Sequence, residues 1–281
     1  MVDVAIINWN TARAALEAAE SLLAAEGVDT QVKVVDNLSA EGERELLREQ
    51  GELEGLELIL SDRNLGFGAA ANLALSRGSA DLVCVSNADA ASSQSALREL
   101  AEVATNRPDA GMVGPVFQSR THRYHSALPG ATTLLARIFV GSVGTSAVPV
   151  PAPGEVIEVG QASGAFFVMR RQVWEELGGF DERFFLWYED VDLAKRAVAT
   201  GRHNLVVGAA RVAHTGAASF QQLDPRTAQA IRLDSLGSYI DKHHGRLMPL
   251  ARPLLATSRA LRARGEGAAG FRGLRAAPGR R

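Results

Sequence analysis

The sequence predicts an α/β protein, with a mostly parallel central sheet, helices on both faces of that sheet, and a helical C-terminal segment. Three observations support this prediction. Short β-branched runs alternate with longer Ala-, Leu- and Glu-rich segments through the first 117 residues. Polar turn-forming residues follow the first four of these runs, as expected where strands end in loops. Near the C-terminus, Asp224 followed by Pro225 is a strong signal for the start of a helix.

The first part of the chain is expected to hold five strands, at residues 4–7, 32–35, 56–60, 82–85 and 111–116. Strands that alternate with helices at this spacing pair in parallel, and ligands bind beyond their carboxyl ends. Helices are expected between them: Asn10 is expected to cap one that continues to Ala25, Ser39 one that continues to Glu49, and Ser92 or Ser93 one that continues to Thr105.

The rest of the chain contains a second ordered region and a C-terminal part. Residues 118–155 are rich in Gly, Pro, Ser, Thr and His around one apolar patch, Leu134 to Val140, so we expect an irregular segment there. Strands at 165–169 and 205–207 and helices at 171–177 and 189–200 follow, and a helix runs from Asp224 to about His243. Beyond it, Pro249 and Pro253 argue against one clean amphipathic helix. We divide the chain into residues 1–117, 118–223 and 224–281.

Composition limits the possible partners. A formal net charge of −2 gives no reason to expect nucleic acid as a partner. No apolar run approaches the roughly 20 residues that span a bilayer, and no signal peptide is evident, so we expect a cytoplasmic protein. The end of the chain is nevertheless basic, because nine arginines follow Lys242 against the single acid Glu266. The lone cysteine, Cys84, lies in an apolar run and is expected to be a small buried hydrophobe.

Polar residues follow each of the first four predicted strands and should meet at one edge of the sheet. Any one of these segments, taken alone, fits an ordinary turn, since Asn, Asp and Gly are the usual turn formers. Four together at the ligand-binding edge favour a binding site. The segments are Asn8-Trp9-Asn10-Thr11, Asp36-Asn37, Asn64-Leu65-Gly66-Phe67-Gly68 and Asn87-Ala88-Asp89.

The glycine-rich segment also raises the possibility of a nicotinamide cofactor. Residues 66–71 fit the G-x-G-x-x-G/A pattern, and Asp89 lies roughly 20 residues further on. In a dinucleotide fold, however, that pattern belongs after the first strand, whereas here it follows the third and the first turn has no glycine. An NAD(P)-dependent oxidoreductase is therefore the weaker alternative.

Asn87 and Asp89 are candidate ligands of a divalent metal. They flank Ala88 at the end of an apolar strand, so their side chains face the same side of an extended backbone. A carboxylate and an amide oxygen suit Mg²⁺ or Mn²⁺, which substrate phosphates commonly help to hold. The alternative is a pair of residues that merely cap the next helix.

A second acidic cluster, Glu189-Asp190-Val191-Asp192, follows an aromatic run. Three acids at a helix start could simply complement the helix dipole. Asp192 can pair with Arg196 on the helix surface, four residues on. Asp190 points to another face near apolar walls, a setting that raises a carboxyl pKa and suits a general base. His214 is either a metal ligand or a core histidine.

These residues resemble glycosyltransferase family 2, particularly its bacterial rhamnosyltransferase-like members, from Val4 to about Ser219. The resemblance is carried by motifs in the family's order and spacing. They are Val35-Asp36-Asn37-Leu38-Ser39, Asn64-Leu65-Gly66-Phe67-Gly68 with Asn72, Asn87-Ala88-Asp89, Gly178-Gly179-Phe180-Asp181-Glu182 and Glu189-Asp190-Val191-Asp192-Leu193. The family implies a Rossmann-like GT-A fold, a divalent metal, inversion at the sugar carbon and a nucleoside-diphosphate sugar donor.

The resemblance also implies roles for individual residues. Asp190, with Glu189, is expected to be catalytic, and Asp89 and His214 to bind Mg²⁺ or Mn²⁺. Asn87 stands where the metal-binding D-x-D signature has its first Asp, which removes one negative charge. Donor contacts are expected from Asn8, Trp9, Asn10, Thr11, Asp36, Asn37, Asn64, Gly66, Phe67, Gly68, Asn72, Asn87 and Asp89, and acceptor contacts from Gly164, Trp187 and Tyr188.

The sequence thus predicts an inverting glycosyltransferase of cell-surface polysaccharide or glycolipid synthesis, with L-rhamnose as a possible donor sugar. Residues 1–117 would form the donor-binding half and residues 118–223 the acceptor-binding and catalytic half of one GT-A domain. Residues 224–281 would add a helix and a basic tail, which either contacts an anionic membrane carrying a glycan or lipid-linked acceptor or is disordered and solvated. A sugar-nucleotide-binding protein without transferase activity is the other alternative.

Overall fold

A computed structural model of the chain describes residues 1–118, 124–140, 147–214 and 222–263, with side chains up to residue 260. Its main feature is a sheet with the strand order β3-β2-β1-β4-β10-β6-β11-β5, to which β9 adds by pairing with β11. The strands are β1 (Val2–Asn8), β2 (Thr30–Asp36), β3 (Leu56–Leu60), β4 (Leu82–Asn87), β5 (Ala90–Ser92), β6 (Ala110–Phe117), β9 (Val156–Val159), β10 (Phe166–Arg170) and β11 (His203–His214).

The first four long strands pair in parallel, as the alternating pattern predicts. β1 lies between β2 and β4, and β3 extends the sheet beyond β2. In register, Asn8 at the end of β1 lies opposite Asp36 at the end of β2, and Ile7 lies opposite Asn87 of β4. The polar residues after these strands therefore gather at one edge. The predicted α/β fold class is confirmed.

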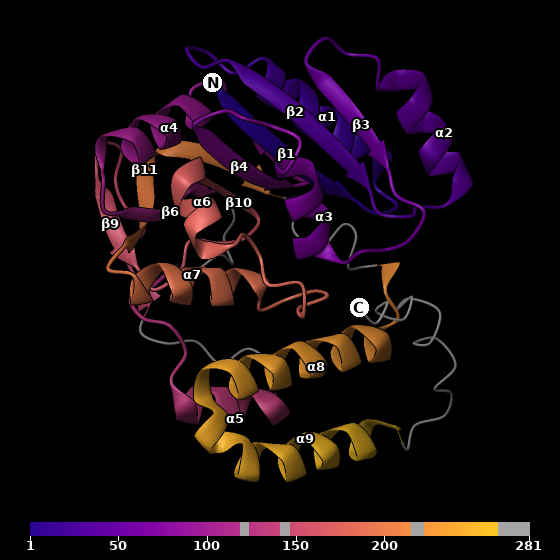
Figure 1. Cartoon of the computed structure of the whole chain (residues 1–281), viewed down its shortest axis with the longest axis vertical. Coiled ribbons are helices and arrows are strands. Elements are labelled where there is room, and N and C mark those ends of the chain that lie inside the picture. Colours follow the sequence, from indigo (N-terminus) through magenta and orange to yellow (C-terminus); the bar gives the residue numbers. More distant parts are fainter. Residues whose placement is uncertain (119–123, 141–146, 215–221, 264–281) are drawn as a thin grey trace.

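Helices cover both faces of the sheet because its central strands are apolar on both sides. On one face, Val4 and Ile6 of β1 belong to the same buried cluster as α1 (Ala12–Leu23) and α4 (Ala96–Asn106). On the other face, Ala5 and Ile7 pack with α3 (Phe67–Leu75), α6 (Arg171–Leu177) and α7 (Glu189–Ala199). Figure 1 shows α7 beside the sheet, between the sheet and the C-terminal helices.

Strand β10 is antiparallel to both of its neighbours, β4 and β6. β4 and β6 are consecutive long strands in the sequence, yet β10 separates them. A segment from the second half of the chain therefore completes the sheet begun by the first half. The insertion also brings the loop before β10 to the carboxyl end of β4, where Asn87 N donates to Ala165 O over 2.8 Å.

A third buried cluster lies away from the sheet and joins three helices (Figure 1). These are α5 (Ala131–Val140), α8 (Pro225–His244) and α9 (Met248–Ala263), with a short 3-10 turn, Gly245–Leu247, between the last two. Tyr188 and Val191, at the start of α7, belong to the same cluster. The C-terminal helices thus pack against the segment that begins α7.

The start of α8 is confirmed: Asp224 caps the helix by accepting from Thr227 N over 2.8 Å, and Pro225 is its first residue. The expectation of an irregular 118–155 segment was wrong for residues 131–140, which form α5, and short strands β7 (Tyr124–His125) and β8 (Ala147–Val148) pair within it. The doubt about a helix through Pro249 and Pro253 was also wrong. Pro249 lies in the first turn of α9, where no backbone donor is lost, and the helix continues through Pro253.

Three predicted caps were wrong. Asn10 precedes α1 by two residues and has φ of +54°, and its carboxamide accepts from Ala40 N. Ser39 hydroxyl accepts from Asn10 N instead of capping α2 (Glu41–Gln50), and Ser92 lies in β5 while α4 begins at Ala96. The Asn10 and Ser39 side chains make contacts between two loops, and the Ser92 hydroxyl donates to the backbone oxygen of its neighbour Ser93. Across the described residues, no helix combines the length and apolar character needed to cross a bilayer.

Candidate active site

The ends of β1 and β2 are joined by a buried cluster of polar side chains. Asn8 donates from Nδ2 to Asp36 Oδ1 over 3.0 Å and to Ser39 Oγ over 3.2 Å. Its own Oδ1 accepts from both the backbone N and the hydroxyl of Thr11. Asn8 and Asp36 have no exposed surface, so they hold the loops after β1 and β2 together from the protein interior. Trp9 and Asn10, on the turn they hold, are both partly exposed.

The loop after β3 is held to the loop after β2 by Asn37. Asn37 is 3% exposed; its Oδ1 accepts from Leu65 N over 2.7 Å and its Nδ2 donates to Gly66 O over 3.1 Å. Asn64 adds a local contact, since its Oδ1 accepts from Gly66 N. Gly66 itself has φ of +84°, and a Cβ there would lie 2.4 Å from Phe185 O. Only glycine fits this position, which presses the loop against residues just before α7.

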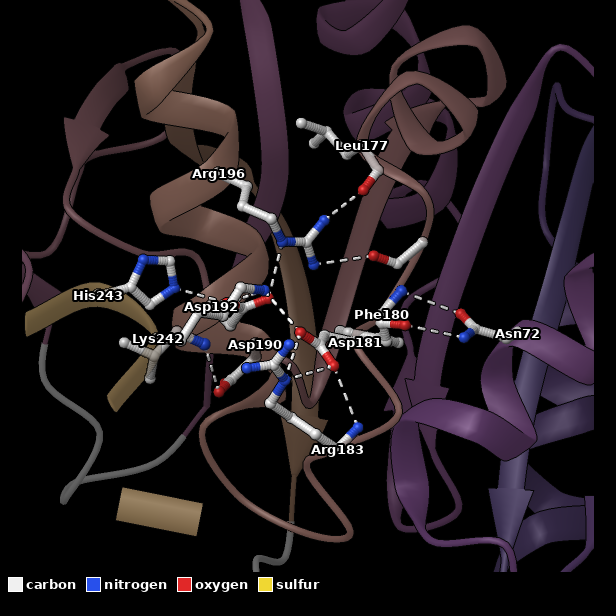
Figure 2. A network of polar contacts seen from close by, with 12 residues as sticks. Asn72, Leu177, Phe180, Asp181, Arg183, Asp190, Asp192, Arg196, Lys242 and His243 are labelled. Carbon is white, nitrogen blue, oxygen red and sulfur yellow. Dashed lines mark hydrogen bonds and ion pairs between the residues drawn. The ribbon is translucent and has the colours of Figure 1, made fainter. Parts of the chain in front are cut away.

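Helix α3 connects the same loop to the second half of the chain. Phe67 N donates to Phe185 O over 2.9 Å, and its ring lies 6.0 Å from that of Phe180. Asn72 bonds to both backbone groups of Phe180, as Figure 2 shows. A Cβ on Gly68 would meet Phe180 at 2.9 Å. The Asn64–Asn72 segment therefore contacts the residues that lead into α7.

Asn87, Asp89 and His214 lie together at the carboxyl end of β4. His214 Nε2 is 3.2 Å from Asp89 Oδ1 and 3.3 Å from Asn87 Nδ2. Pairing of β11 with β5 places His214 beside Asp89, because His214 lies opposite Ala90, the residue after Asp89. The Asp89 side chain is 9% exposed. Within the described part of the chain, no three His, Cys, Asp or Glu side chains gather as a ready metal site.

Glu189 and Asp190 form an acidic pair at the start of α7, in which Glu189 is buried and Asp190 is partly exposed. Burial raises the pKa of Asp190, and hydrogen bonds to its carboxylate partly offset that effect. Burial, together with the neighbouring Asp190 charge, raises the pKa of Glu189 still further. Glu189 is 6% exposed, and its Oε2 has no hydrogen-bond partner among the described residues. The pair therefore has the raised proton affinity expected of a general base and its neighbour.

Three donors orient the Asp190 carboxylate. Gln161 Nε2 lies 2.6 Å and Gly164 N 3.0 Å from Oδ2, while Val191 N donates to Oδ1 over 2.8 Å. A Cβ on Gly164 would lie 2.7 Å from Asp190 Cβ, so this glycine allows the close approach. The next residue, Ala165, accepts from Asn87 N. Two consecutive residues thus join the acidic pair to the Asn87–Asp89 segment.

An unusual backbone precedes α7. Trp187 and Tyr188 both have left-handed φ angles, +65° and +71°, which L-residues adopt only at a cost of about 1 kcal/mol or more each. Tyr188 is 6% exposed and its ring lies 5.4 Å from that of Tyr239 in α8. Trp187 is partly exposed. Of the two residues, Trp187 is the more accessible to a second substrate.

Comparison with known proteins assigns this arrangement to a family. Residues 2–231 match the model of glycosyltransferase like family 2. The chain belongs to this family. Its activity is sugar transfer, and the alternative of a nicotinamide-dependent oxidoreductase is excluded.

Two curated relatives are informative. Over 240 residues the glycosyltransferase is 29% identical to an N-acetylglucosaminyl-diphospho-decaprenol L-rhamnosyltransferase of Mycobacterium tuberculosis, and the match covers 76% of each protein. It is 30% identical over 196 residues to the O-antigen biosynthesis protein RfbC of Myxococcus xanthus, covering 67% of this chain and 15% of that protein.

Solved structures share the fold of this glycosyltransferase. A mannosyltransferase of Pyrobaculum calidifontis, in complex with GDP-Man and Mn²⁺, superposes with a TM-score of 0.58 at 18% identity, covering 95% of this chain and 76% of the other. S. aureus TarS 1-349 with UDP-GlcNAc gives 0.57 at 14% identity, covering 93% and 72%. The predicted GT-A fold is confirmed.

Three features of the candidate site were not predicted from the sequence. Gln161, which bonds to Asp190, lies in a loop without a recognisable motif. Ser39, predicted to cap a helix, links the loops after β1 and β2. Asp192, expected on the helix surface with Arg196, is fully buried. The Arg196 pair is present, but partners from α8 enclose the carboxylate, and their positions in the sequence give no sign of that contact.

Proposed function

We propose that this glycosyltransferase moves a sugar, with L-rhamnose as the first candidate, from a nucleoside-diphosphate donor to an acceptor hydroxyl, with inversion at the anomeric carbon. The relative that is 29% identical is named as an L-rhamnosyltransferase acting on a diphospho-decaprenol-linked sugar, which supports rhamnose and a lipid-linked acceptor. The second relative is named as an O-antigen biosynthesis protein, which supports a role in cell-surface glycan synthesis.

The connection between Asp190 and Asn87 through Gly164 and Ala165 is the observation that carries the proposal. It places a carboxylate of raised pKa beside the strand end expected to bind the donor diphosphate. Asp190 would take the proton of the acceptor hydroxyl as that oxygen bonds to the anomeric carbon and the nucleotide leaves from the opposite face. A general base contributes typically 10²–10⁴-fold to such a reaction.

Asp89 and His214 are the residues we assign to a divalent metal. One carboxylate and one imidazole within 3.2 Å of each other are too few to enclose a cation, but they fit one that a substrate diphosphate also binds. Asn87 can add an amide oxygen if its carboxamide turns, since the oxygen and nitrogen of an amide are interchangeable by rotation. When bound, Mg²⁺ or Mn²⁺ would supply positive charge for the leaving diphosphate.

The donor nucleotide is proposed to bind over the loops after β1, β2 and β3. Trp9 and Asn10 are partly exposed there and could contact the base or ribose. Buried Asn8, Asp36 and Asn37 hold these loops in place. In this scheme residues 1–117 bind the donor, and residues 118–223 supply Asp190 and the acceptor contacts of Gly164 and Trp187, with Tyr188 supporting them from within.

A donor-turnover assay tests the proposal. Purified protein is incubated with dTDP-, UDP- and GDP-sugars, Mn²⁺ and a diphosphate-linked N-acetylglucosamine acceptor, and released nucleotide and product are measured. We expect Asp190→Asn to lower turnover by about 10² or more while nucleotide affinity survives. Normal turnover by that variant would disprove the base assignment. Nucleotide binding without turnover of any donor by the wild type would instead support a sugar-nucleotide-binding protein.

Calorimetry tests the metal assignment. Asp89→Ala should abolish the effect of Mn²⁺ on nucleoside-diphosphate binding, because it removes the one carboxylate of the set. Asn87→Asp should strengthen Mn²⁺ binding by adding a negative charge on the same side of the strand. Unchanged Mn²⁺ dependence in Asp89→Ala would contradict the assignment.

We also propose that the C-terminal part contacts an anionic membrane. On α9, Leu250 is 60% exposed, and Arg252 and Arg259 lie on the surface. The arginines from 264 onward fall outside the described residues. Ala251 and Leu255 are buried, so a test deletion should begin at residue 264 and leave α9 intact. Flotation with liposomes containing about 30% anionic lipid should fall on this deletion and in Arg252→Glu; equal flotation would indicate a solvated tail.

A further inference from the structure

A network of charged side chains links α7, which carries Asp190, to the end of α8 (Figure 2). At its centre is Asp192, whose side chain has no exposed surface. Arg196 Nε lies 2.7 Å from Oδ2, while Lys242 Nζ at 2.7 Å and His243 Nε2 at 2.6 Å share Oδ1. A buried carboxylate needs such compensation, since an unpaired charge in the interior is strongly destabilising.

The contacts reach beyond this carboxylate to the loop that leads into α7. Lys242 Nζ also lies 2.7 Å from Asp181 Oδ2. Arg196 donates to Leu177 O and Gly179 O, at the end of α6. In the loop of residues 177–188, Arg196 therefore holds Leu177 and Gly179, and Lys242 holds Asp181.

Helix α8 also holds the end of that loop. Ser235 hydroxyl donates to Leu186 O over 2.8 Å, and Tyr239 packs against Tyr188. Ser235, Tyr239, Lys242 and His243 are spaced as one face of a helix. This face of α8 contacts the chain on both sides of Trp187 and Tyr188. These two residues have left-handed φ angles, and the contacts with α8 must offset the free-energy cost of that conformation.

We infer that Lys242 and His243 are positioning residues for Asp190, acting through Asp192 and the backbone of the first turn of α7. Asp192 N donates to Tyr188 O over 2.9 Å, so the carboxylate they bind belongs to the turn that contains Asp190. Neither residue contacts Asp190. The match to the family model covers residues 2–231, so both residues lie beyond the matched part of the chain.

The two residues contribute differently to the network. Lys242 brings a full charge and bridges Asp181 and Asp192. Burial lowers the pKa of His243, which therefore acts mainly as a neutral hydrogen-bond donor from Nε2. Asp192 keeps Arg196 when either residue is replaced, so the buried carboxylate stays paired and the variants should fold.

The test compares Lys242→Met, Lys242→Arg and His243→Ala with the wild type. The inference rests on Asp190 as the base. We expect Lys242→Met to lower kcat about 10- to 100-fold, as a misplaced catalytic group does, with the donor KM changed less than about twofold. His243→Ala should act in the same direction, and Lys242→Arg should restore most of the loss. Hydrogen exchange of residues 184–192 should be faster in Lys242→Met, a readout independent of activity.

Asp241→Asn is the matched control, because Asp241 precedes Lys242 on α8 but is exposed to solvent. It should have wild-type kcat and exchange. Wild-type kcat in both Lys242→Met and His243→Ala, with turnover still dependent on Asp190, would overturn the inference and leave the proposed function intact. The inference would also be overturned if Lys242→Met lowered the melting temperature together with kcat and Lys242→Arg restored neither. Turnover that is independent of Asp190 would instead overturn the proposed function.

Discussion

Gly164 is the position at which a single methyl group should disable the proposed base. A Cβ there would lie 2.7 Å from Asp190 Cβ, whereas ordinary van der Waals contact begins at 3.4 Å, so one side must move by about 0.7 Å. The Gly164 φ angle lies outside the left-handed region, so alanine is not disfavoured by the backbone itself. The three heavy atoms nearest to the added methyl group all belong to the Asp190 side chain.

Gly164→Ala should therefore lower kcat about 10- to 100-fold, because a misplacement of about 1 Å can cost 10²-fold. That range corresponds to about 1.4 to 2.7 kcal/mol of lost transition-state stabilisation. The assay is steady-state turnover of the active donor at saturating acceptor, with nucleotide affinity measured separately and expected to be unchanged. Gly42→Ala is the control, since a Cβ at this helical position meets nothing within 4 Å. Wild-type kcat in Gly164→Ala would refute the requirement for close contact with Asp190.

Two further predictions concern the acidic pair and the donor loops. The folded-state pKa of Glu189 lies above its unfolded value, so its contribution to stability is present at low pH and is lost as pH rises through the folded pKa. Between about pH 5 and about pH 8, the melting temperature of the wild type should therefore fall more than that of Glu189→Gln. Parallel curves of melting temperature against pH for the two proteins would contradict this prediction. Asn37→Ala should cost about 1–3 kcal/mol in urea unfolding, because Leu65 N and Gly66 O lose their partner. It should also raise the donor KM, while an unchanged KM would show that the loop after β3 does not contribute to donor binding.

The first half of the fold could be predicted because its signals are local. Each of the first four strands ends in polar residues close in sequence, and parallel pairing brings Asn8 opposite Asp36. The order of the strands is not a local property. The sequence marked residues 165–169 as a strand, but nothing in it indicated that this strand separates β4 from β6. For that reason the contact of Gly164 with Asp190 was not foreseen.

The C-terminal helices were harder to predict for two reasons. Pro253 suggested a helix break in α9, yet the buried contacts of Ala251 and Leu255 on the same helix outweigh the local cost. Asp192 was matched with Arg196 because the two are four residues apart, whereas His243 is 51 residues away. The spacing of an i,i+4 pair can be recognised in a sequence, whereas the contacts of Asp192 with Lys242 and His243 cannot.

The insertion of β10 has a consequence for synthesis of the protein. When the nascent chain has reached residue 117, β4 and β6 are both present, but the strand that separates them is still to be made. Each would present unpaired backbone groups, and direct pairing of the two would close a sheet with one strand missing. Productive folding must therefore wait for residues 166–170, and because such long-range pairing is slow, we expect the ribosome-bound first half to depend on chaperones.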